Sequence, residues 1–388
     1  MRLFECDKCQ NLIYFENVHC ERCGSRIGFR DDQMRLTAIE PISGEKQGWA
    51  QLWRSVRDPE DHFKLCANTI YDACNWLIPA EKSDDYCTAC RFNRTVPDLG
   101  DPASVLLWEK VEAAKHRLIY GLLRLRLPII SKFDNPAIGL AFDFLADPNI
   151  ADYVTEHSSV ILTGHARGVI TINIAEADDV VREERRRQFS EPYRTLLGHF
   201  RHEIGHYYWE RLIRDGQRID PFRRLFGDER ANYQKALEAH YNQYTKPDWE
   251  ESYVSAYAAA HPWEDWAECW AHYMHMVDTL ETAHHFGMRV SPRTTTIAKT
   301  MTTADFDPYG EPDFQAIIGT WLPLTHAVNS LNRSMGQPDL YPFVLSQKVI
   351  EKLGFIHDLL NSLDDADRFD STAFGRMGTQ MAAPGTGL

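Results

Sequence analysis

The sequence predicts an α+β fold, with a small β-rich module over residues 1–100 and a mainly α-helical domain with a short β-sheet over residues 101–365. Three observations support this division. Eight of the nine cysteines precede residue 91. Apolar residues recur at helical spacing in several later segments, and two short runs of β-branched residues lie between residues 160 and 174. We expect residues 366–388, rich in Gly, Ala, Ser and Thr, to form a disordered tail.

The composition, the net charge and the opening residues argue against several classes of protein, namely nucleic-acid-binding, membrane and secreted proteins. A net charge of -14 over 388 residues argues against broad binding to nucleic acid or to an anionic membrane. No apolar run approaches the roughly 20 residues of a membrane helix. The opening residues 1–7 run directly into cysteine and acid, so they do not resemble a signal peptide. We therefore expect a cytoplasmic protein.

The early cysteines fall in patterns typical of metal sites. Two Cys-x-x-Cys pairs, each beside a short β-type run, predict a zinc ribbon with one closed structural site made by Cys6, Cys9, Cys20 and Cys23. A looser set predicts a second structural zinc site at Cys66, Cys74, Cys87 and Cys90. His62 could replace one thiolate of that set. Disulfides are the alternative for both sets, and they would require an oxidising compartment.

Several later segments have clear secondary-structure signals. Residues 97–102, with two prolines and a glycine, form a natural boundary. The apolar spacing predicts helices over residues 104–127, 228–244, 261–276, 313–335 and 346–363. Residues 160–165 and 169–174 read as a β-hairpin. Its edge strand could pair with an extended substrate backbone, or the hairpin could be purely structural.

The central motif is His202-Glu203-x-x-His206, within a helix expected to begin at Ser190 and to end near residue 215. Residues four apart share one helical face, so both imidazoles can bind one Zn²⁺. Glu203, beside the first ligand, is suited to take a proton from zinc-bound water. Gly205 costs about 1 kcal/mol of helix propensity, so we expect a metal, a substrate or a strand to approach it closely.

A second helix, over residues 261–276, is expected to complete this site. Glu264 and Glu268 lie one turn apart among buried tryptophans, which suits one of them to bind zinc and the other to fix a histidine ring. The spacing leaves open which does which. His199 is expected to lie beside the metal ligands without binding the metal itself, because a fourth protein ligand would close the site. Cys269 is interpreted as a buried side chain, with zinc ligation as a regulatory alternative.

These motifs together resemble the bacterial zinc-binding metallopeptidases that carry an N-terminal zinc ribbon. The resemblance covers nearly all of the chain apart from its tail, and the matching stretches are the ribbon cysteines and residues 198–209, 226–230 and 261–268. It implies a zincin-like catalytic domain of the gluzincin type, with two histidines and one glutamate on zinc. More distantly, residues 264–268 look like the third-ligand helix of the anthrax lethal factor group. That likeness implies Glu264 as the ligand, Glu268 as its support and Tyr257 as a catalytic residue assisting the oxyanion, with Tyr253 close by.

The expected function is therefore a zinc-dependent metallopeptidase. It would carry one catalytic zinc and one or two structural zincs, with Glu203 as general base and a peptide or protein as substrate. A protein partner of the ribbon is also possible. One alternative is a zinc-ribbon adaptor that binds protein or nucleic acid, with an inactive scaffold. Another is a zinc hydrolase of non-peptide amides, because the water-activating chemistry would be the same.

Overall fold

The computed structural model describes residues 1–42, 51–146, 163–189, 191–242, 246–293 and 301–363. The expected tail, the predicted strand residues 160–162 and the predicted helix cap Ser190 lie outside these ranges. None of the helices in the described ranges is long and apolar enough to cross a membrane.

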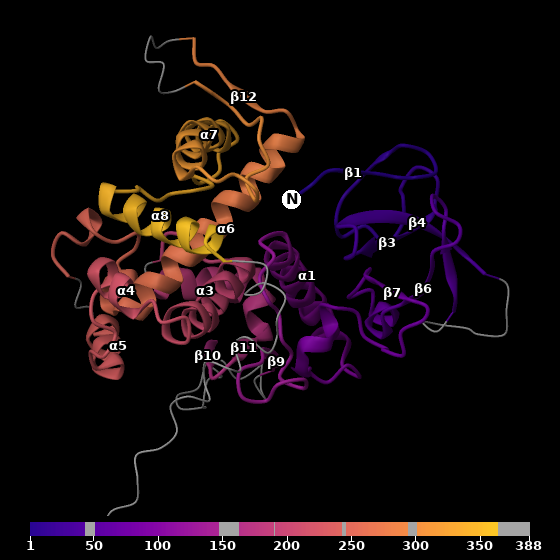
Figure 1. The fold of residues 1–388 in the computed structure, drawn as a ribbon, viewed down its shortest axis with the longest axis horizontal. Helices are drawn as coiled ribbons and strands as arrows, with labels where there is room; N and C mark the ends of the chain where they lie inside the picture. Colours follow the sequence, from indigo (N-terminus) through magenta and orange to yellow (C-terminus); the bar gives the residue numbers. More distant parts are fainter. Residues whose placement is uncertain (43–50, 147–162, 190, 243–245, 294–300, 364–388) are drawn as a thin grey trace, which may run out of the picture.

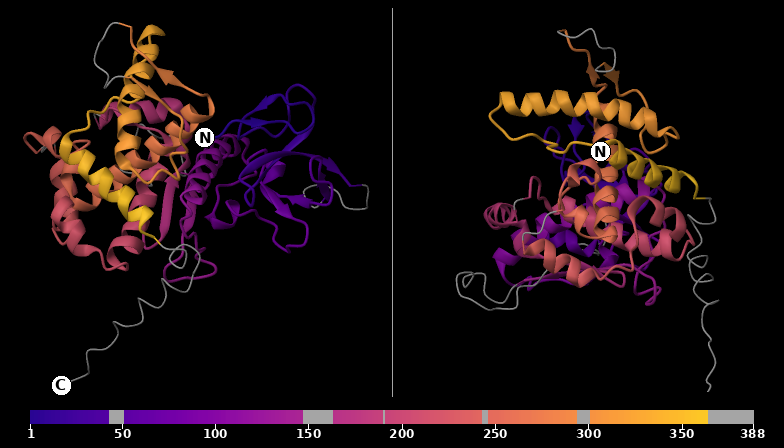
Figure 2. Two further views of the ribbon diagram at one scale, coloured as in Figure 1. Left: turned by 45° about the horizontal axis from the view of Figure 1, so that its top comes forward. Right: turned by 90° about the vertical axis from the view of Figure 1, so that its left-hand side faces the viewer.

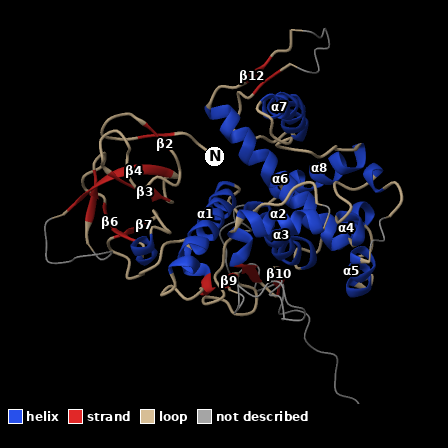
Figure 3. Ribbon diagram, turned by 180° about the vertical axis from the view of Figure 1, so that it is seen from behind, coloured by secondary structure: helices blue, strands red, loops and turns tan. Residues whose placement is uncertain are grey.

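The N-terminal region is built from short antiparallel strands (Figures 1 and 3). A two-stranded pair lies beside a five-stranded sheet of order β3-β4-β5-β6-β7. The pair consists of β1 (Phe4–Glu5) and β2 (Leu12–Ile13), and the sheet of β3 (Arg26–Arg30), β4 (Arg35–Pro41), β5 (Trp53–Ser55), β6 (His62–Leu65) and β7 (Leu77–Pro79). Fully buried Phe29 and Trp76 pack with ring centroids 4.6 Å apart, which gives this region a small aromatic core.

A second sheet belongs to the later part of the chain. Its order is β10-β11-β9-β8, with β10 and β11 antiparallel and the other pairs parallel. The strands are β8 (Asn93–Thr95), β9 (Ala141–Leu145), β10 (Gly164–Ala166) and β11 (Val169–Asn173). The β10–β11 pair is the predicted hairpin, and β8 shows that this sheet takes one strand from the first hundred residues.

Helices form most of the remaining described chain. They are α1 (Pro102–Arg124), α2 (Asp179–Gln188), α3 (Leu196–Tyr208), α4 (Ile219–Phe226), α5 (Tyr233–Tyr241), α6 (Pro262–His285), α7 (Phe314–Ser334) and α8 (Gln347–Asn361). A small strand pair, β12 (Arg289–Val290) and β13 (Thr302–Thr303), lies between α6 and α7. The α+β prediction is thus confirmed: a β-rich region precedes a mostly helical domain with a short sheet.

Several helix boundaries differ from the sequence prediction. The motif helix begins at Leu196, because the side chain of Thr195 accepts a hydrogen bond from the Gly198 amide and caps it. Beyond Tyr208 it continues as a π-helix over Trp209–Arg214. Helix α5 begins only at Tyr233, where Asn232 caps it. Helix α6 continues to His285, nine residues beyond its predicted end at residue 276.

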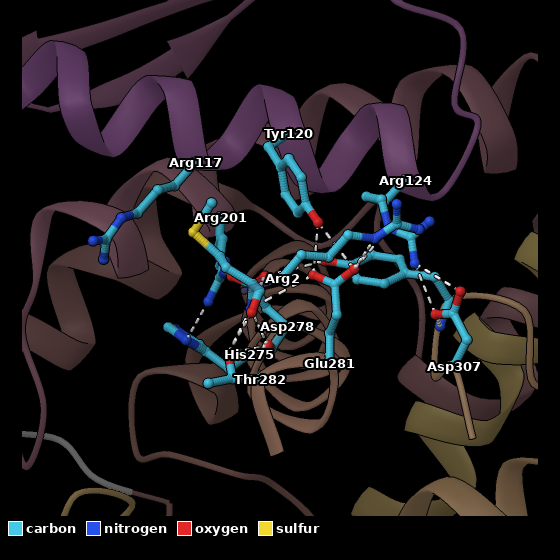
Figure 4. Close-up of polar contacts among 12 residues, drawn as sticks. Arg2, Arg117, Tyr120, Arg124, Arg201, His275, Asp278, Glu281, Thr282 and Asp307 are labelled. Atoms are coloured by element: carbon cyan, nitrogen blue, oxygen red, sulfur yellow. Dashed lines mark hydrogen bonds and ion pairs between the residues drawn. The ribbon is translucent and has the colours of Figure 1, made fainter. Parts of the chain in front are cut away.

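Helix α1 joins the two regions. Figure 1 and the left view of Figure 2 show the N-terminal strands on one side of α1 and the helices from α3 onward on the other. On the side of α1 that faces the N-terminal strands, the ring centroid of Tyr120 lies 5.3 Å from that of Phe15. Figure 4 shows Tyr120 and Arg124 directed at Glu281 of α6. The hydroxyl of Tyr120 and Nε of Arg124 each donate to a carboxylate oxygen of Glu281 at 2.8 Å. Because Glu281 is almost fully buried, these charge-assisted bonds fix α1 firmly against α6.

Candidate functional site

Helices α3 and α6 pack in direct contact beneath the motif. A Cβ atom at Gly205 would lie 3.0 Å from the Cα of Ala267 and 3.1 Å from the Cβ of Trp270. The indole of Trp266 donates to the carbonyl of Gly205 at 2.9 Å. The expected close approach at Gly205 is therefore present, but the neighbour is another helix. The absence of a side chain at Gly205 brings the two acids of α6 close to the two histidines of α3.

Three side chains converge at this helix contact. The Nε2 atom of His202 lies 3.0 Å from Oε2 of Glu264, and Nε2 of His206 lies 3.6 Å from the same oxygen. One donor atom from each of these residues lies within 4.8 Å of the others. Two imidazole nitrogens and one carboxylate oxygen form the donor set of catalytic zinc sites that keep a position open for water. The residues present therefore fit a zinc ion.

Glu268 lies on the other side of the His202 ring. Its Oε1 atom is 2.9 Å from Nδ1 of His202, and its Oε2 accepts a hydrogen bond from Ser255 at 2.7 Å. Donation from Nδ1 to a carboxylate fixes the ring orientation and leaves Nε2 unprotonated for metal. The geometry thus separates the two acids whose roles the helical spacing left open: Glu264 faces both Nε2 atoms, and Glu268 faces Nδ1.

Tyr233 and Ser255 contact the site and were not identified from the sequence. The hydroxyl of Tyr233, at the start of α5, donates to Oε1 of Glu264 at 2.6 Å. This bond occupies one carboxylate oxygen and leaves the other directed at the two imidazoles. Tyr233 carries no pattern that would reveal this role, since it sits 31 residues before Glu264. Ser255 lies between Tyr253 and Tyr257, and a serine at this position has no sequence pattern that indicates a contact with Glu268.

A cavity of about 1130 Å³ opens beside His202, which is the one of the three converging side chains that lines it. His202, Glu203, Tyr257 and Glu268 contribute to its lining. Glu203 is 8% exposed, and burial raises the pKa of its carboxyl group. A carboxylate with a raised pKa, next to the first imidazole and facing an open cavity, is suited to accept and return a proton.

The other predicted site residues lie around the same cavity. The ring of Tyr257 has its centroid 5.8 Å from that of His202, whereas the hydroxyl of Tyr253 accepts from Lys246 at the surface. His199 also lines the cavity, with Nδ1 3.8 Å from a carboxylate oxygen of Glu176. The group of three donors around Glu264, as found among the described residues, does not include His199.

Cys269 is fully buried in α6. Its thiol lies 3.7 Å from Oδ1 of Asp265 and, in the described part of the chain, belongs to none of the groups able to hold a metal. Asp265 in turn pairs with Lys352 of α8. The sulfur therefore faces the α8 side of the helix, which agrees with its interpretation as a buried side chain.

The hairpin lies against the second histidine. The ring of His165, in β10, stacks on that of His206 with centroids 6.2 Å apart. Burial lowers the pKa of His165 to about 3, and its Nε2 accepts a hydrogen bond from the Gly168 amide. Strand β10 is at the edge of its sheet among the described strands. Pairing of this edge with a substrate stays a prediction.

Two cysteine clusters lie in the N-terminal region. The sulfur atoms of the first cluster lie within 4.8 Å of one another, and its members are Cys6, Cys9, Cys20 and Cys23. The backbone turns tightly at each pair, with the Gln10 amide donating to the Cys6 carbonyl and the Gly24 amide to the Cys20 carbonyl. Four thiolates at this spacing suit a closed tetrahedral zinc site.

The second cluster is fully buried and contacts α1. It comprises Cys66, Cys74, Cys87 and Cys90, again with sulfur atoms within 4.8 Å. Backbone amides of Trp76 and Cys90 donate to the sulfurs of Cys74 and Cys87 at 3.4 Å. His62 is exposed on β6 and is not part of the cluster.

Helix α1 adds polar groups to the second cluster. Nε2 of His116 lies 3.5 Å from the Cys90 sulfur, and a Glu112 oxygen lies 3.6 Å from it. These three side chains could also gather around a cation, but the buried ammonium of Lys115 is 2.7 Å from that same carboxylate. A cation there would face Lys115 directly. The four-sulfur set is therefore the better metal site, with α1 supplying charge compensation for its thiolates.

Comparison with known proteins agrees with this geometry. Uncharacterized proteins of Mycobacterium tuberculosis and Mycobacterium bovis are 41% identical to this chain over 364 residues, which is 94% of this chain and 96% of each relative. No solved structure matches. Residues 3–101 match a zinc-ribbon domain model. Residues 104–359 match the model of a family described as "putative zinc-binding metallo-peptidase", and the chain belongs to that family.

Proposed function

We propose that this protein is a zinc-dependent metallopeptidase in which Glu203 is the general base. The observation that carries the proposal is the convergence of His202, His206 and Glu264, with His202 and the adjacent Glu203 at the wall of a cavity. A zinc ion held by these three ligands would lower the pKa of a bound water to ~7 and polarise the substrate carbonyl.

Side chains of the protein would then transfer the proton of the attacking water. Glu203 accepts a proton from the water as the water oxygen attacks the carbonyl carbon of a peptide bond. The same carboxyl group delivers that proton to the departing nitrogen as the carbon–nitrogen bond breaks. Tyr257 borders the cavity beside His202, and we assign it a role in hydrogen bonding to the developing oxyanion.

The neighbouring residues would hold the ligands in place. Glu268 orients His202 through Nδ1, and Tyr233 orients Glu264 through Oε1. The cavity volume suits side chains of a peptide or protein substrate on either side of the scissile bond. Two cysteine-bound zincs would serve a structural role in the N-terminal region, so the full complement would be three.

The decisive experiment compares wild type with Glu203→Gln in a cleavage assay on proteome-derived peptide libraries. The variant should bind zinc as wild type does and lose turnover by about 10²–10⁴-fold, because the amide cannot accept a proton. Glu238→Gln is a matched control: it is the same change at an exposed position of α5, and it should leave cleavage unaltered. Full activity of Glu203→Gln would contradict the assignment.

A further inference from the structure

The segment Ser252–Tyr257, just before α6, carries two parts of the site. The hydroxyl of Ser255 donates to Glu268 at 2.7 Å, and Glu268 contacts Nδ1 of His202 at 2.9 Å. Tyr257 lies beside the same imidazole, with the two ring centroids 5.8 Å apart. The position of this segment relative to α6 therefore sets the orientation of the first histidine.

One buried ammonium group ties this segment to α6. Lys352, in α8, is 4% exposed, and its Nζ donates to the carbonyl of Ser252 and to Oδ2 of Asp265, each at 2.6 Å. The same ammonium lies 4.4 Å from the ring centroid of Tyr253. Asp265 is fully buried and directly follows Glu264 in the chain.

An ion pair of this kind is poorly explained by stability alone. Removing both charges from water is costly, and apolar residues of similar volume often stabilise a fold equally well. An apolar pair, however, cannot bind a backbone carbonyl. Only a group with several donors can hold the Ser252 carbonyl and the Asp265 carboxylate at one point.

We infer that Lys352 is a positioning residue, which holds the Ser252–Tyr257 segment against α6 and thereby orients His202 through Ser255 and Glu268. The catalytic consequence rests on the proposed function. The consequence for zinc affinity does not, because it concerns only how well the His202 ring is presented to a metal.

The test uses two double variants of the full-length protein. Lys352→Met with Asp265→Leu removes both charges and the bond to Ser252 while keeping similar volumes. Lys352→Gln with Asp265→Asn also removes the charges but keeps an amide that can donate to the Ser252 carbonyl. We expect the apolar pair to lower zinc affinity at the histidine site by about 10–100-fold, and the amide pair to retain affinity near that of wild type.

Peptide cleavage supplies a second measurement. In the apolar pair kcat should fall while KM stays close to the wild-type value, since the cavity is unchanged. Lys348→Met is the matched control. It removes a lysine one turn earlier in α8, whose ammonium reaches only the exposed side of the segment, at the Ser252 hydroxyl, and it should match wild type.

The outcomes distinguish a role of Lys352 in positioning His202 from a role in determining the fold. Equal zinc affinity in wild type and both double variants would overturn the inference, and so would an apolar pair that fails to fold, because Lys352 would then determine the fold and not the site. If wild type cleaves no peptide, the proposed function fails, but the zinc titrations still decide the role of Lys352.

Discussion

The cysteine clusters and the histidine–glutamate site are two different ways of gathering metal ligands. Each brings donor atoms within 4.8 Å of one another. The cysteine sets offer four thiolates each, which fills a tetrahedral shell and leaves no place for a substrate. The histidine–glutamate set offers three donors, and one of its members, His202, lines a large cavity. The number of donor atoms, and the access that a substrate has to the metal, are therefore the properties that distinguish a structural site from a catalytic one.

The two kinds of site also differ in what assembles them. Paired cysteines lie in short turns whose own backbone bonds hold the sulfurs close, so metal binding and local folding are one event. Glu264 reaches His202 from 62 residues away, and only the packing of α6 on α3 brings them together. We therefore expect metal at the cysteine clusters to contribute to the stability of the fold, and the fold to form the histidine–glutamate site before metal binds there.

The largest effect is expected at the second cysteine cluster. Cys74→Ser removes a buried ligand in a region with a small core, so one zinc should be lost and the free energy of unfolding should fall by on the order of 5 kcal/mol or more. Calorimetry and metal analysis measure both quantities. Cys269→Ser, outside the clusters, should keep three zincs. A Cys74 variant with full zinc content would remove the distinction between the sites.

Partial metal removal should separate the sites next. A moderate chelator should take zinc from the three-donor site first, because four thiolates hold the ion more tightly than two imidazoles and one carboxylate. Activity should disappear and the zinc content fall from three to two, with little change in the thermal unfolding temperature. Added zinc should restore cleavage. Loss of the fold together with activity would show that the histidine site is also structural.

Gly205→Ala should weaken the helix contact that builds the histidine site. The added Cβ would meet the Ala267 backbone at 3.0 Å, so we expect destabilisation of about 1–3 kcal/mol and weaker zinc binding at the histidines. Gly319→Ala in α7 meets nothing within 4 Å and should be stabilising by up to about 1 kcal/mol. Denaturant unfolding and zinc titration measure the stability and the zinc affinity of both variants. Equal changes in the two variants would mean that the α3–α6 contact is not tight.

The smallest effect concerns the Glu264 carboxylate. Tyr233→Phe removes only the hydroxyl that donates to Oε1, so zinc affinity at the histidine site should fall about tenfold while the cysteine zincs stay bound. Tyr14→Phe, at an exposed ring in the N-terminal region, serves as its control. Unchanged affinity in the Tyr233 variant would assign that hydrogen bond to packing alone.

Much of this architecture could be predicted because it depends on local spacing. The Cys-x-x-Cys pairs, the one-turn separation of His202 and His206 and the periodicity of α6 are properties of short segments. The start of α3 could not be predicted as well, because Ser190 and Thr195 are both good caps and only the surrounding packing selects Thr195. The π-helical continuation after Tyr208 likewise has no local signal.

The sequence by itself determined the types of metal ligand, because the identity of each residue fixes whether it offers an imidazole, a carboxylate or a thiolate. The helical spacing alone left open which acid of α6 faces Nε2 of His202, and the tertiary structure places Glu264 there. The tertiary structure also adds Tyr233, Ser255 and Lys352 to the contacts around the site. Those contacts join helices and segments far apart in the chain. Their geometry depends on how closely the elements pack, which residue spacing within one segment does not specify.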